Sequence, residues 1–185
     1  MRNPALLIID VQNAILRPAA TRRQAENRAA LDAVIARIAI LIERAQERGV
    51  SILFVQHDAP PGHRLEKNTP GWQIRPEIAP KASVPVIHKT ECDSFFETAL
   101  SAELQARKIS ELIVAGCMTQ YCIDTTVRRA VSMGYDVTLA ADGHMTEDSG
   151  ALTFEQIIEH HNAVLDGLSA GPHSVRVVPH DQIAF

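Results

Sequence analysis

The chain has 185 residues, 46% of them hydrophobic, and its 18 basic and 22 acidic side chains give a formal net charge of −4. This length and composition indicate one globular domain over residues 1–185, and the slight negative charge argues against a nucleic-acid or anionic-membrane partner. No apolar run approaches the roughly 18 residues of a membrane span, and the opening MRNPALLIIDVQ is interpreted as a first strand rather than a signal peptide.

The first part of the chain is predicted to form a strand, a long helix and a second strand. Ala5–Ile9 is a continuous apolar run, typical of a strand that is buried on both faces, and Asp10 ends it. Thr21 is expected to cap a helix that Gly49 terminates, and Ser51–Val55 is predicted as the second strand.

A long irregular segment, residues 56–83, follows the second strand. It contains five prolines, two glycines and Trp72, the only tryptophan. Loops of this length in a compact domain are usually functional, so we interpret the segment as a lid or a binding loop. Val84–His88 is predicted as the third strand, and Lys89 comes directly after it.

The next elements are a short helix, a strand and a second helix. Phe95–Arg107 is predicted as the short helix, with Phe96 turned inward, and Leu112–Ala115 as a fourth strand that Gly116 breaks. The apolar residues that follow Cys122 recur at helical spacing, so Cys122 is expected in the first turn of the second helix.

Two more strands are predicted at Tyr135–Ala141 and Ser174–Val178, with a helix between them that Thr153 and Gln156 begin as a capping box. His161 lies on the apolar stripe of that helix and is interpreted as a structural histidine. Because strands alternate with helices, the sequence predicts a single three-layer α/β/α domain with a six-stranded, mostly parallel sheet.

Three reactive side chains follow strand ends in this pattern: Asp10 after the first strand, Lys89 after the third and Cys122 a turn after the fourth. Each by itself has an ordinary explanation as a turn residue, a surface charge or a core thiol. Ligands of parallel sheets bind beyond the carboxyl ends of the strands, and strands one, three and four are expected to lie side by side there. The combination therefore predicts a nucleophilic site.

The chemistry of these groups is complementary. A helix start and the nearby Lys89 are expected to favour the Cys122 thiolate. Asp10 is suited to move a proton between the thiol and a leaving group. The backbone amides of Met118 and Cys122 are suited to hold an oxyanion.

These residues lie in segments that resemble the isochorismatase-like cysteine hydrolase superfamily, which includes nicotinamidases and N-carbamoylsarcosine amidases: LLIIDVQN, VIHKTECDSFFETAL and ELIVAGCMTQYCIDTTVRRAVSMGYDVTLAADGH. The resemblance implies that Asp10, Lys89 and Cys122 form a catalytic triad. That triad would cleave the C–N bond of a small amide or carbamoyl compound through a thioester on Cys122. The resemblance also implies a Rossmann-like fold, a cis peptide bond at Cys117–Met118, no cofactor, and a homo-dimer or homo-tetramer.

The segment after the second strand differs from that of nicotinamidases, which hold a metal there. His57, Asp58 and His63 are residue types that ligate metals, but their order does not match the nicotinamidase motif. They are interpreted as surface loop residues, and no metal is expected.

Four residues are predicted to line the substrate pocket: Gln12, Leu16, Trp72 and Tyr121. Their roles are inferred from their places after Asp10, in the long loop and before Cys122. The sequence does not identify the substrate.

The other two thiols, Cys92 and Cys117, are interpreted as small structural residues. An odd number of cysteines without a C-x-x-C pair favours a reducing, cytoplasmic setting over a disulfide scaffold. Three alternatives stay open: a non-amide substrate of the isochorismatase type, thiol redox chemistry between Cys122 and Cys117, and a catalytically weak scaffold.

Overall fold

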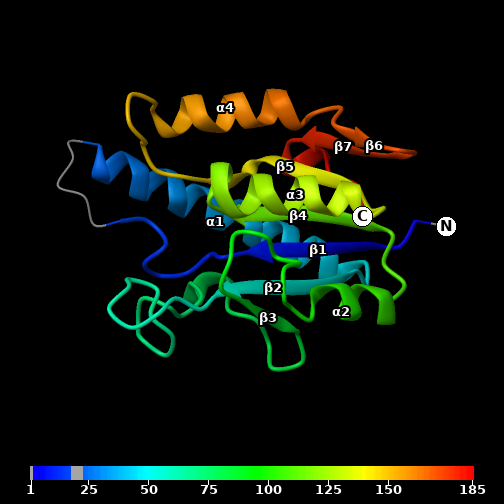
Figure 1. The fold of residues 1–185 in the computed structure, drawn as a ribbon, viewed down its shortest axis with the longest axis horizontal. Helices are drawn as coiled ribbons and strands as arrows, with labels where there is room; N and C mark the ends of the chain where they lie inside the picture. Colours follow the sequence, from blue (N-terminus) through cyan, green and yellow to red (C-terminus); the bar gives the residue numbers. More distant parts are fainter. Residues whose placement is uncertain (1, 18–22) are drawn as a thin grey trace.

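The computed structural model describes residues 2–17 and 23–185 and shows a twisted sheet between layers of helices (Figure 1). Thr21, the expected cap of the first helix, lies outside the described residues. None of the helices in the described ranges combines the length and apolarity that crossing a membrane requires.

The sheet has the strand order β3-β2-β1-β4-β5-β7-β6. Its strands are β1 (Pro4–Ile9), β2 (Ser51–His57), β3 (Val86–Lys89), β4 (Glu111–Cys117), β5 (Asp136–Met145), β6 (Ser169–Ala170) and β7 (His173–Val178). Six of them pair in parallel, while the two-residue β6 runs antiparallel to β7. The predicted count of six omitted β6, because a two-residue strand has no hydrophobic pattern to reveal it.

Helices cover both faces of the sheet, so the predicted three-layer α/β/α architecture is confirmed. They are α1 (Gln24–Glu47), α2 (Leu100–Ala106), α3 (Asp124–Ser132) and α4 (Phe154–Leu165), with short 3-10 helices at Pro76–Ile78 and His180–Gln182. Helix α1 packs on one face and α2 and α3 on the other, while α4 lies beside α3 near β5 and β7 (Figure 1).

The central strand β1 explains why the apolar run near the N-terminus has no alternation. Leu6 and Ile8 pack toward α1, whereas Leu7 and Ile9 pack toward α2 and α3, and all four have no exposed surface. Each such side chain contributes about 1.5–3 kcal/mol when it leaves water. Both layers of helices are therefore anchored on the strand that ends at Asp10.

The predicted helix Phe95–Arg107 was wrong in its first turn. Helix α2 begins only at Leu100, and Phe96 is 52% exposed rather than inward. The preceding backbone turns because side chains compete for its amides: the Phe95 N–H donates to Asp93 Oδ1 and the Leu100 N–H donates to Thr98 Oγ1.

The predicted ends of β4 and β5 were also wrong. Gly116 does not break β4, which continues to Cys117, and β5 continues past Ala141 to Met145. The extensions pair with each other after a register shift, with Gly116 opposite His144. By contrast, the capping box of Thr153 and Gln156 at the start of α4 is confirmed.

The order of the strands corrects one further expectation. Strand β2 lies between β3 and β1, so the strands that carry Lys89 and Asp10 are not neighbours. The chain leaves β1 toward β2 and later returns to its other side at β4, so the topological switch point is between β1 and β4. Parallel sheets bind ligands beyond the strand ends at this point.

Candidate active site

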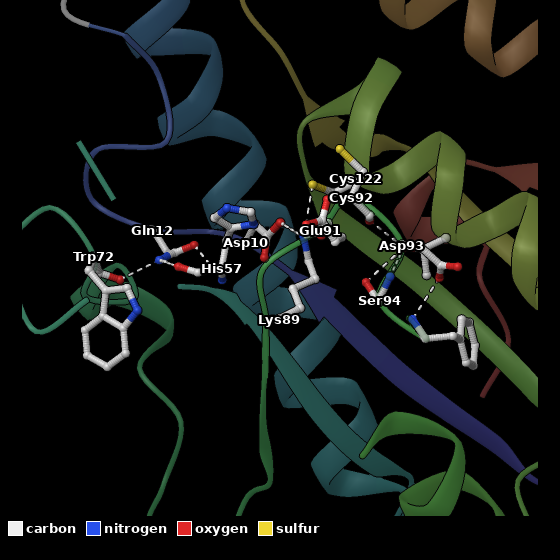
Figure 2. Close-up of polar contacts among 12 residues, drawn as sticks. Asp10, Gln12, His57, Trp72, Lys89, Glu91, Cys92, Asp93, Ser94 and Cys122 are labelled. Carbon is white, nitrogen blue, oxygen red and sulfur yellow. Dashed lines mark hydrogen bonds and ion pairs between the residues drawn. The ribbon is translucent and has the colours of Figure 1, made fainter. Parts of the chain in front are cut away.

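Lys89 connects the groups that follow the strand ends. Its ammonium nitrogen Nζ lies 2.6 Å from Asp10 Oδ2 and donates a hydrogen bond of 3.1 Å to Cys122 Sγ. A third contact, of 2.9 Å, goes to the carbonyl oxygen of Glu91. Figure 2 shows Asp10, Lys89 and Cys122 converging from three different segments. The long side chain of Lys89 thus spans the gap that β2 makes between β3 and β1.

The backbone at the end of β1 directs Asp10 into this cluster. Asp10 has φ of +52°, a left-handed conformation that is uncommon for residues other than glycine. Its N–H still donates to the carbonyl oxygen of Val55 on β2, at 2.9 Å. The chain therefore turns sharply after β1 without leaving the sheet. Strained backbone of this kind concentrates at functional sites.

Cys122 lies in a π-helical turn, Thr119–Ile123, that leads into α3. The carbonyl oxygen of Met118 accepts hydrogen bonds from the N–H groups of Tyr121 and Ile123. The peptide bond between Cys117 and Met118 is cis. We call residues 116–122 the nucleophile turn.

Gly116 is required where the nucleophile turn leaves β4. Its φ is +129°, and a Cβ atom there would lie 2.1 Å from the carbonyl oxygen of Ile9. Only glycine lets β4 approach β1 this closely in this conformation. The close approach brings the turn that carries Cys122 against the end of the strand that carries Asp10.

Burial shifts the ionisation of all three groups. Burial, followed by the charge of Cys122, raises the pKa of the Asp10 carboxyl well above its usual range, although Lys89 opposes the shift. Burial lowers the pKa of Lys89, but the attraction of Asp10 and Cys122 outweighs it, so the net shift is upward. Lys89 therefore stays positively charged.

The thiol of Cys122 differs from the expectation of a thiolate. A hydrogen bond with Cys92, followed by burial, raises the pKa of Cys122, while Lys89 lowers it. The same contact lowers the pKa of Cys92 to about 6, so the helix start by itself does not make Cys122 the more acidic of the two thiols. The carboxyl of Asp10, whose pKa is also raised by burial, lies beside this thiol.

Cys92 is the neighbour of Cys122 that the sequence reasoning missed. It was interpreted as a small structural residue, but it is exposed and its side chain lies beside Cys122 (Figure 2). The signal available in the sequence was its place three residues after Lys89. There the chain has left β3 and passes beside α3, where the carbonyl oxygen of Cys92 accepts from the hydroxyl of Thr126. Cys117, the thiol considered for redox chemistry, is buried in the core instead.

Two of the predicted pocket residues connect the long loop to the sheet. The amide nitrogen of Gln12 donates to the carbonyl oxygens of His57 and Trp72, and its oxygen accepts from the N–H of His57. The indole N–H of Trp72 donates to Asp58 Oδ1, and its ring stacks on His88. Gln12 and Trp72 thus lie on the loop side of Asp10 (Figure 2), with the indole ring held by loop contacts.

The other two predicted pocket residues lie apart from each other. Leu16 is half-buried and lines a cavity of about 560 Å³ together with Arg75 and Glu147. The side chains of Asp10, Lys89 and Cys122 do not line that cavity. Tyr121 precedes Cys122 and is 43% exposed.

The three possible metal ligands after β2 have different surroundings. The oxygens of Asp58 already contact Lys67, Trp72 and His88. His63 is exposed, and its Nδ1 accepts from the N–H of Leu65. The remaining residue, His57, faces Asp10 (Figure 2).

The ring of His57 lies beside Asp10 (Figure 2). His57 is half-buried, and its pKa is lowered first by burial and then by the charge of Lys89. The sequence interpretation of His57 as a surface residue was therefore incomplete. A neutral imidazole at this position borders the carboxyl of Asp10.

Comparison with known proteins places these observations in a family. A model of the isochorismatase domain matches residues 4–167. The chain belongs to the isochorismatase family. A solved isochorismatase from Pseudomonas putida KT2440 has 29% sequence identity and a TM-score of 0.84, covering 98% of this chain and 90% of that one.

Relatives with named activities include hydrolases of different substrates. The streptothricin hydrolase of Streptomyces noursei is 35% identical over 144 residues, which are 78% of this isochorismatase-family chain and 50% of that protein. The nicotinamidase of Escherichia coli strain K12 is 36% identical over 95 residues, 45% of this chain and 44% of that protein. The chain spans about half the length of the streptothricin hydrolases it matches.

Proposed function

We propose that this isochorismatase-family protein hydrolyses a C–N bond of a small amide or carbamoyl compound, with Cys122 as nucleophile, Asp10 as general acid and base, and Lys89 as the stabilising cation. The single observation that carries the proposal is the position of Lys89 Nζ, 2.6 Å from Asp10 Oδ2 and 3.1 Å from Cys122 Sγ. Burying the ammonium group of Lys89 costs free energy of desolvation, which is offset by its close contacts with the carboxyl of Asp10 and the sulfur of Cys122. The hydrolase activities of the named relatives support the same reaction class.

In the first half of the reaction, Asp10 takes the proton of the Cys122 thiol as the sulfur bonds to the carbonyl carbon of the substrate. The carbonyl oxygen becomes an oxyanion, which the amides of Met118 and Cys122 are proposed to hold. Asp10 then gives the proton to the leaving nitrogen, the C–N bond breaks, and ammonia or an amine departs. A thioester on Cys122 remains.

In the second half, Asp10 takes a proton from water, whose oxygen attacks the thioester carbon. The bond between carbon and sulfur breaks, the acid is released, and the thiol regains its proton. The raised pKa of Asp10 suits both directions of transfer, since a catalytic acid and base works best near the operating pH. Lys89 keeps its charge throughout and stabilises the sulfur anion as it forms.

The experiment is a panel of small amides and carbamoyl compounds screened for ammonia or amine release, with Cys122→Ser and Cys122→Ala as controls. Turnover is expected in the wild type and in neither variant. Mass spectrometry of the quenched enzyme is expected to find an acyl group on the peptide that contains Cys122. Amide turnover that persisted in Cys122→Ala would overturn the assignment of the nucleophile.

A further inference from the structure

A buried histidine outside the reacting groups is hydrogen-bonded on both sides of its ring. His144, near the end of β5, is 1% exposed. Its Nδ1 lies 2.9 Å from Thr119 Oγ1, and its Nε2 lies 2.8 Å from Asn162 Oδ1. The three side chains come from the nucleophile turn, β5 and α4, so the contacts join three elements.

The partners of Asn162 determine which nitrogen of His144 carries the proton. The side-chain nitrogen of Asn162 donates to the carbonyl oxygen of Ala141, at 2.9 Å, so its oxygen is the atom that faces the ring. That oxygen only accepts hydrogen bonds, so Nε2 of His144 must donate. In the neutral ring Nδ1 then carries a lone pair, and it accepts from the hydroxyl of Thr119.

The ring stays neutral over the range in which a thiol hydrolase works. Burial lowers the pKa of His144 to about 4, although the bond with Asn162 opposes the shift. The direction of both hydrogen bonds is therefore constant around neutral pH. A histidine in this state holds a position and does not exchange protons with the reaction.

Thr119 is where this chain of bonds meets the nucleophile. It is fully buried and begins the π-helical turn in which Cys122 lies three residues later. The same region is held to β5 by backbone pairing, because Gly116 lies opposite His144 in the sheet. The hydroxyl of Thr119 thus fixes the middle of the nucleophile turn, whose beginning is fixed by the sheet.

We propose that His144, oriented by Asn162, is a positioning residue that holds the nucleophile turn through Thr119, so that Cys122 Sγ stays at hydrogen-bond distance from Lys89. The inference rests on the proposed function, because it assigns His144 a part in the reactivity of that thiol. It touches neither substrate nor the reacting atoms. A displacement of about 1 Å at a nucleophile is enough to cost roughly 100-fold in rate.

The central test compares Thr119→Val with Thr119→Ser. Valine keeps the shape of threonine but loses the hydroxyl, whereas serine keeps the hydroxyl. Thr138→Val is the matched control. Thr138 is a buried threonine on β5, at the opposite end of that strand from His144, and its hydroxyl donates to Glu111 on β4. The control removes an equivalent buried hydrogen bond away from the turn.

Two measurements are made on each variant. The first gives kcat and KM for the best amide of the panel. The second gives the rate at which iodoacetamide alkylates Cys122 at pH 7, followed by mass spectrometry of the peptide that contains it. Thr119→Val is expected to lose about 10- to 100-fold in kcat with KM nearly unchanged, and to lose alkylation rate in parallel. Thr119→Ser is expected to recover most of both rates, and Thr138→Val to keep them.

Nitrogen NMR of the His144 ring supplies a readout that does not depend on activity. The wild type is expected to show the tautomer with the proton on Nε2, and Asn162→Leu is expected to shift the ring toward the other tautomer. Wild-type spectra with the proton on Nδ1 would overturn the proposal, as would equal losses of kcat and alkylation in Thr119→Val and Thr138→Val, or wild-type rates in Thr119→Val.

The same data separate this inference from the proposed function. If the wild type turned over no amide while alkylation still depended on the Thr119 hydroxyl, the amide reaction would be wrong and the positioning role would stand. If amides were hydrolysed through Cys122 but Thr119→Val behaved like Thr138→Val, the proposed function would stand and the positioning role of His144 would be wrong.

Discussion

The two regions that flank Asp10 are held together in different ways (Figure 2). On the nucleophile side, the contacts of Asp10, Lys89 and Thr119 are made by side chains that are at most 1% exposed. On the loop side, Asp58 is contacted by Lys67, whose side chain is 52% exposed. Water competes with the second kind of contact and not with the first. The positions of Asp10, Lys89 and Cys122 are therefore fixed by buried contacts, whereas the loop combines the buried anchor of Gln12 with exposed contacts such as that of Lys67.

The largest effect is expected from breaking the buried ion pair. Lys89→Met leaves the Asp10 carboxyl buried without its cation, so we expect a loss of about 3 kcal/mol in the free energy of unfolding at pH 7 and about 10⁴-fold or more in kcat. Without Lys89 the raised pKa of Asp10 rises further above its unfolded value. The variant should therefore regain stability as the pH falls and the carboxyl becomes neutral.

Urea denaturation from pH 5 to 8 measures this effect. The double variant Asp10→Asn, Lys89→Met is the control, because it removes both charges. It should recover much of the stability at pH 7 and none of the activity. A single variant as stable as the wild type at every pH would show that the pair is not held as the structure indicates.

A somewhat smaller effect tests the rigidity of the nucleophile turn. Gly116→Ala places a methyl group against the carbonyl oxygen of Ile9, so we expect it to cost about 3 kcal/mol in the free energy of unfolding, together with a loss of kcat. Gly150→Ala is the matched control: Gly150 also has a positive φ, +60°, but a Cβ there meets nothing within 4 Å. It should cost only about 1 kcal/mol and leave kcat intact. Equal costs for the two substitutions would contradict the close approach of β4 to β1.

Substitutions on the loop side are expected to change substrate binding, measured as KM, rather than the chemical step, measured as kcat. Burial raises the pKa of Asp58, but hydrogen bonds from Lys67, Trp72 and His88 outweigh it and lower the pKa below its ordinary 3.8. The anchoring of the loop by this carboxylate is therefore complete above pH 3.8 and is lost as the pH falls through the lower folded value. Asp58→Asn should raise KM about tenfold and change kcat little.

The fluorescence of Trp72, the only tryptophan, reports on this loop directly. In the wild type it should change with the titration of Asp58 while far-ultraviolet circular dichroism stays constant, and in Asp58→Asn the change should be absent. If Asp58→Asn lowered kcat as strongly as KM rose, the loop would be part of the chemical machinery, and the two regions would not be separable.

The smallest effect concerns Cys92, which lies beside Cys122 (Figure 2). The contact with Cys92 is the leading reason why the pKa of Cys122 is raised, and the same contact lowers the pKa of Cys92 to about 6. Cys92→Ala should therefore lower the pKa of Cys122, so that its alkylation by iodoacetamide begins at lower pH than in the wild type. Cys92→Ser keeps a hydroxyl at the same position and should give a profile between the two. A profile that moved to higher pH in Cys92→Ala would contradict the contact.

The sequence predicted most of the fold because the relevant signals are local. The unbroken apolar run of β1 and the capping box at Thr153 are each contained in a few neighbouring residues, and both agree with the structure. The predictions failed where a distant segment decided the outcome. Gly116 and the Asp142–Gly143 pair are typical of a turn, yet they lie in strands because the ends of β4 and β5 pair, with Gly116 opposite His144. The first turn of α2 was lost to hydrogen bonds of Asp93 and Thr98 with the backbone.

The candidate site shows the same division. Asp10, Lys89 and Cys122 were found because each follows a strand and because their motifs resemble a known superfamily. The neighbours Cys92 and His144 were not, although both lie in the segments that carry the resemblance, because their partners lie 30 and 25 residues away, at Cys122 and Thr119. The position of β2 between β3 and β1 was also invisible, since strand order depends on packing between layers.

By itself, then, the sequence determined the class of fold, the family resemblance and the identity of the three reactive side chains, because strand ends and helix starts are written in short patterns of apolar and polar residues. Only the tertiary structure decided their ionisation and their distances. The pKa of Cys122 is set by Cys92, by burial and by Lys89, and the span of Lys89 across β2 brings its ammonium group to both Asp10 and Cys122. Both results depend on the removal of water from charged groups that lie far apart in the chain, which no local pattern records.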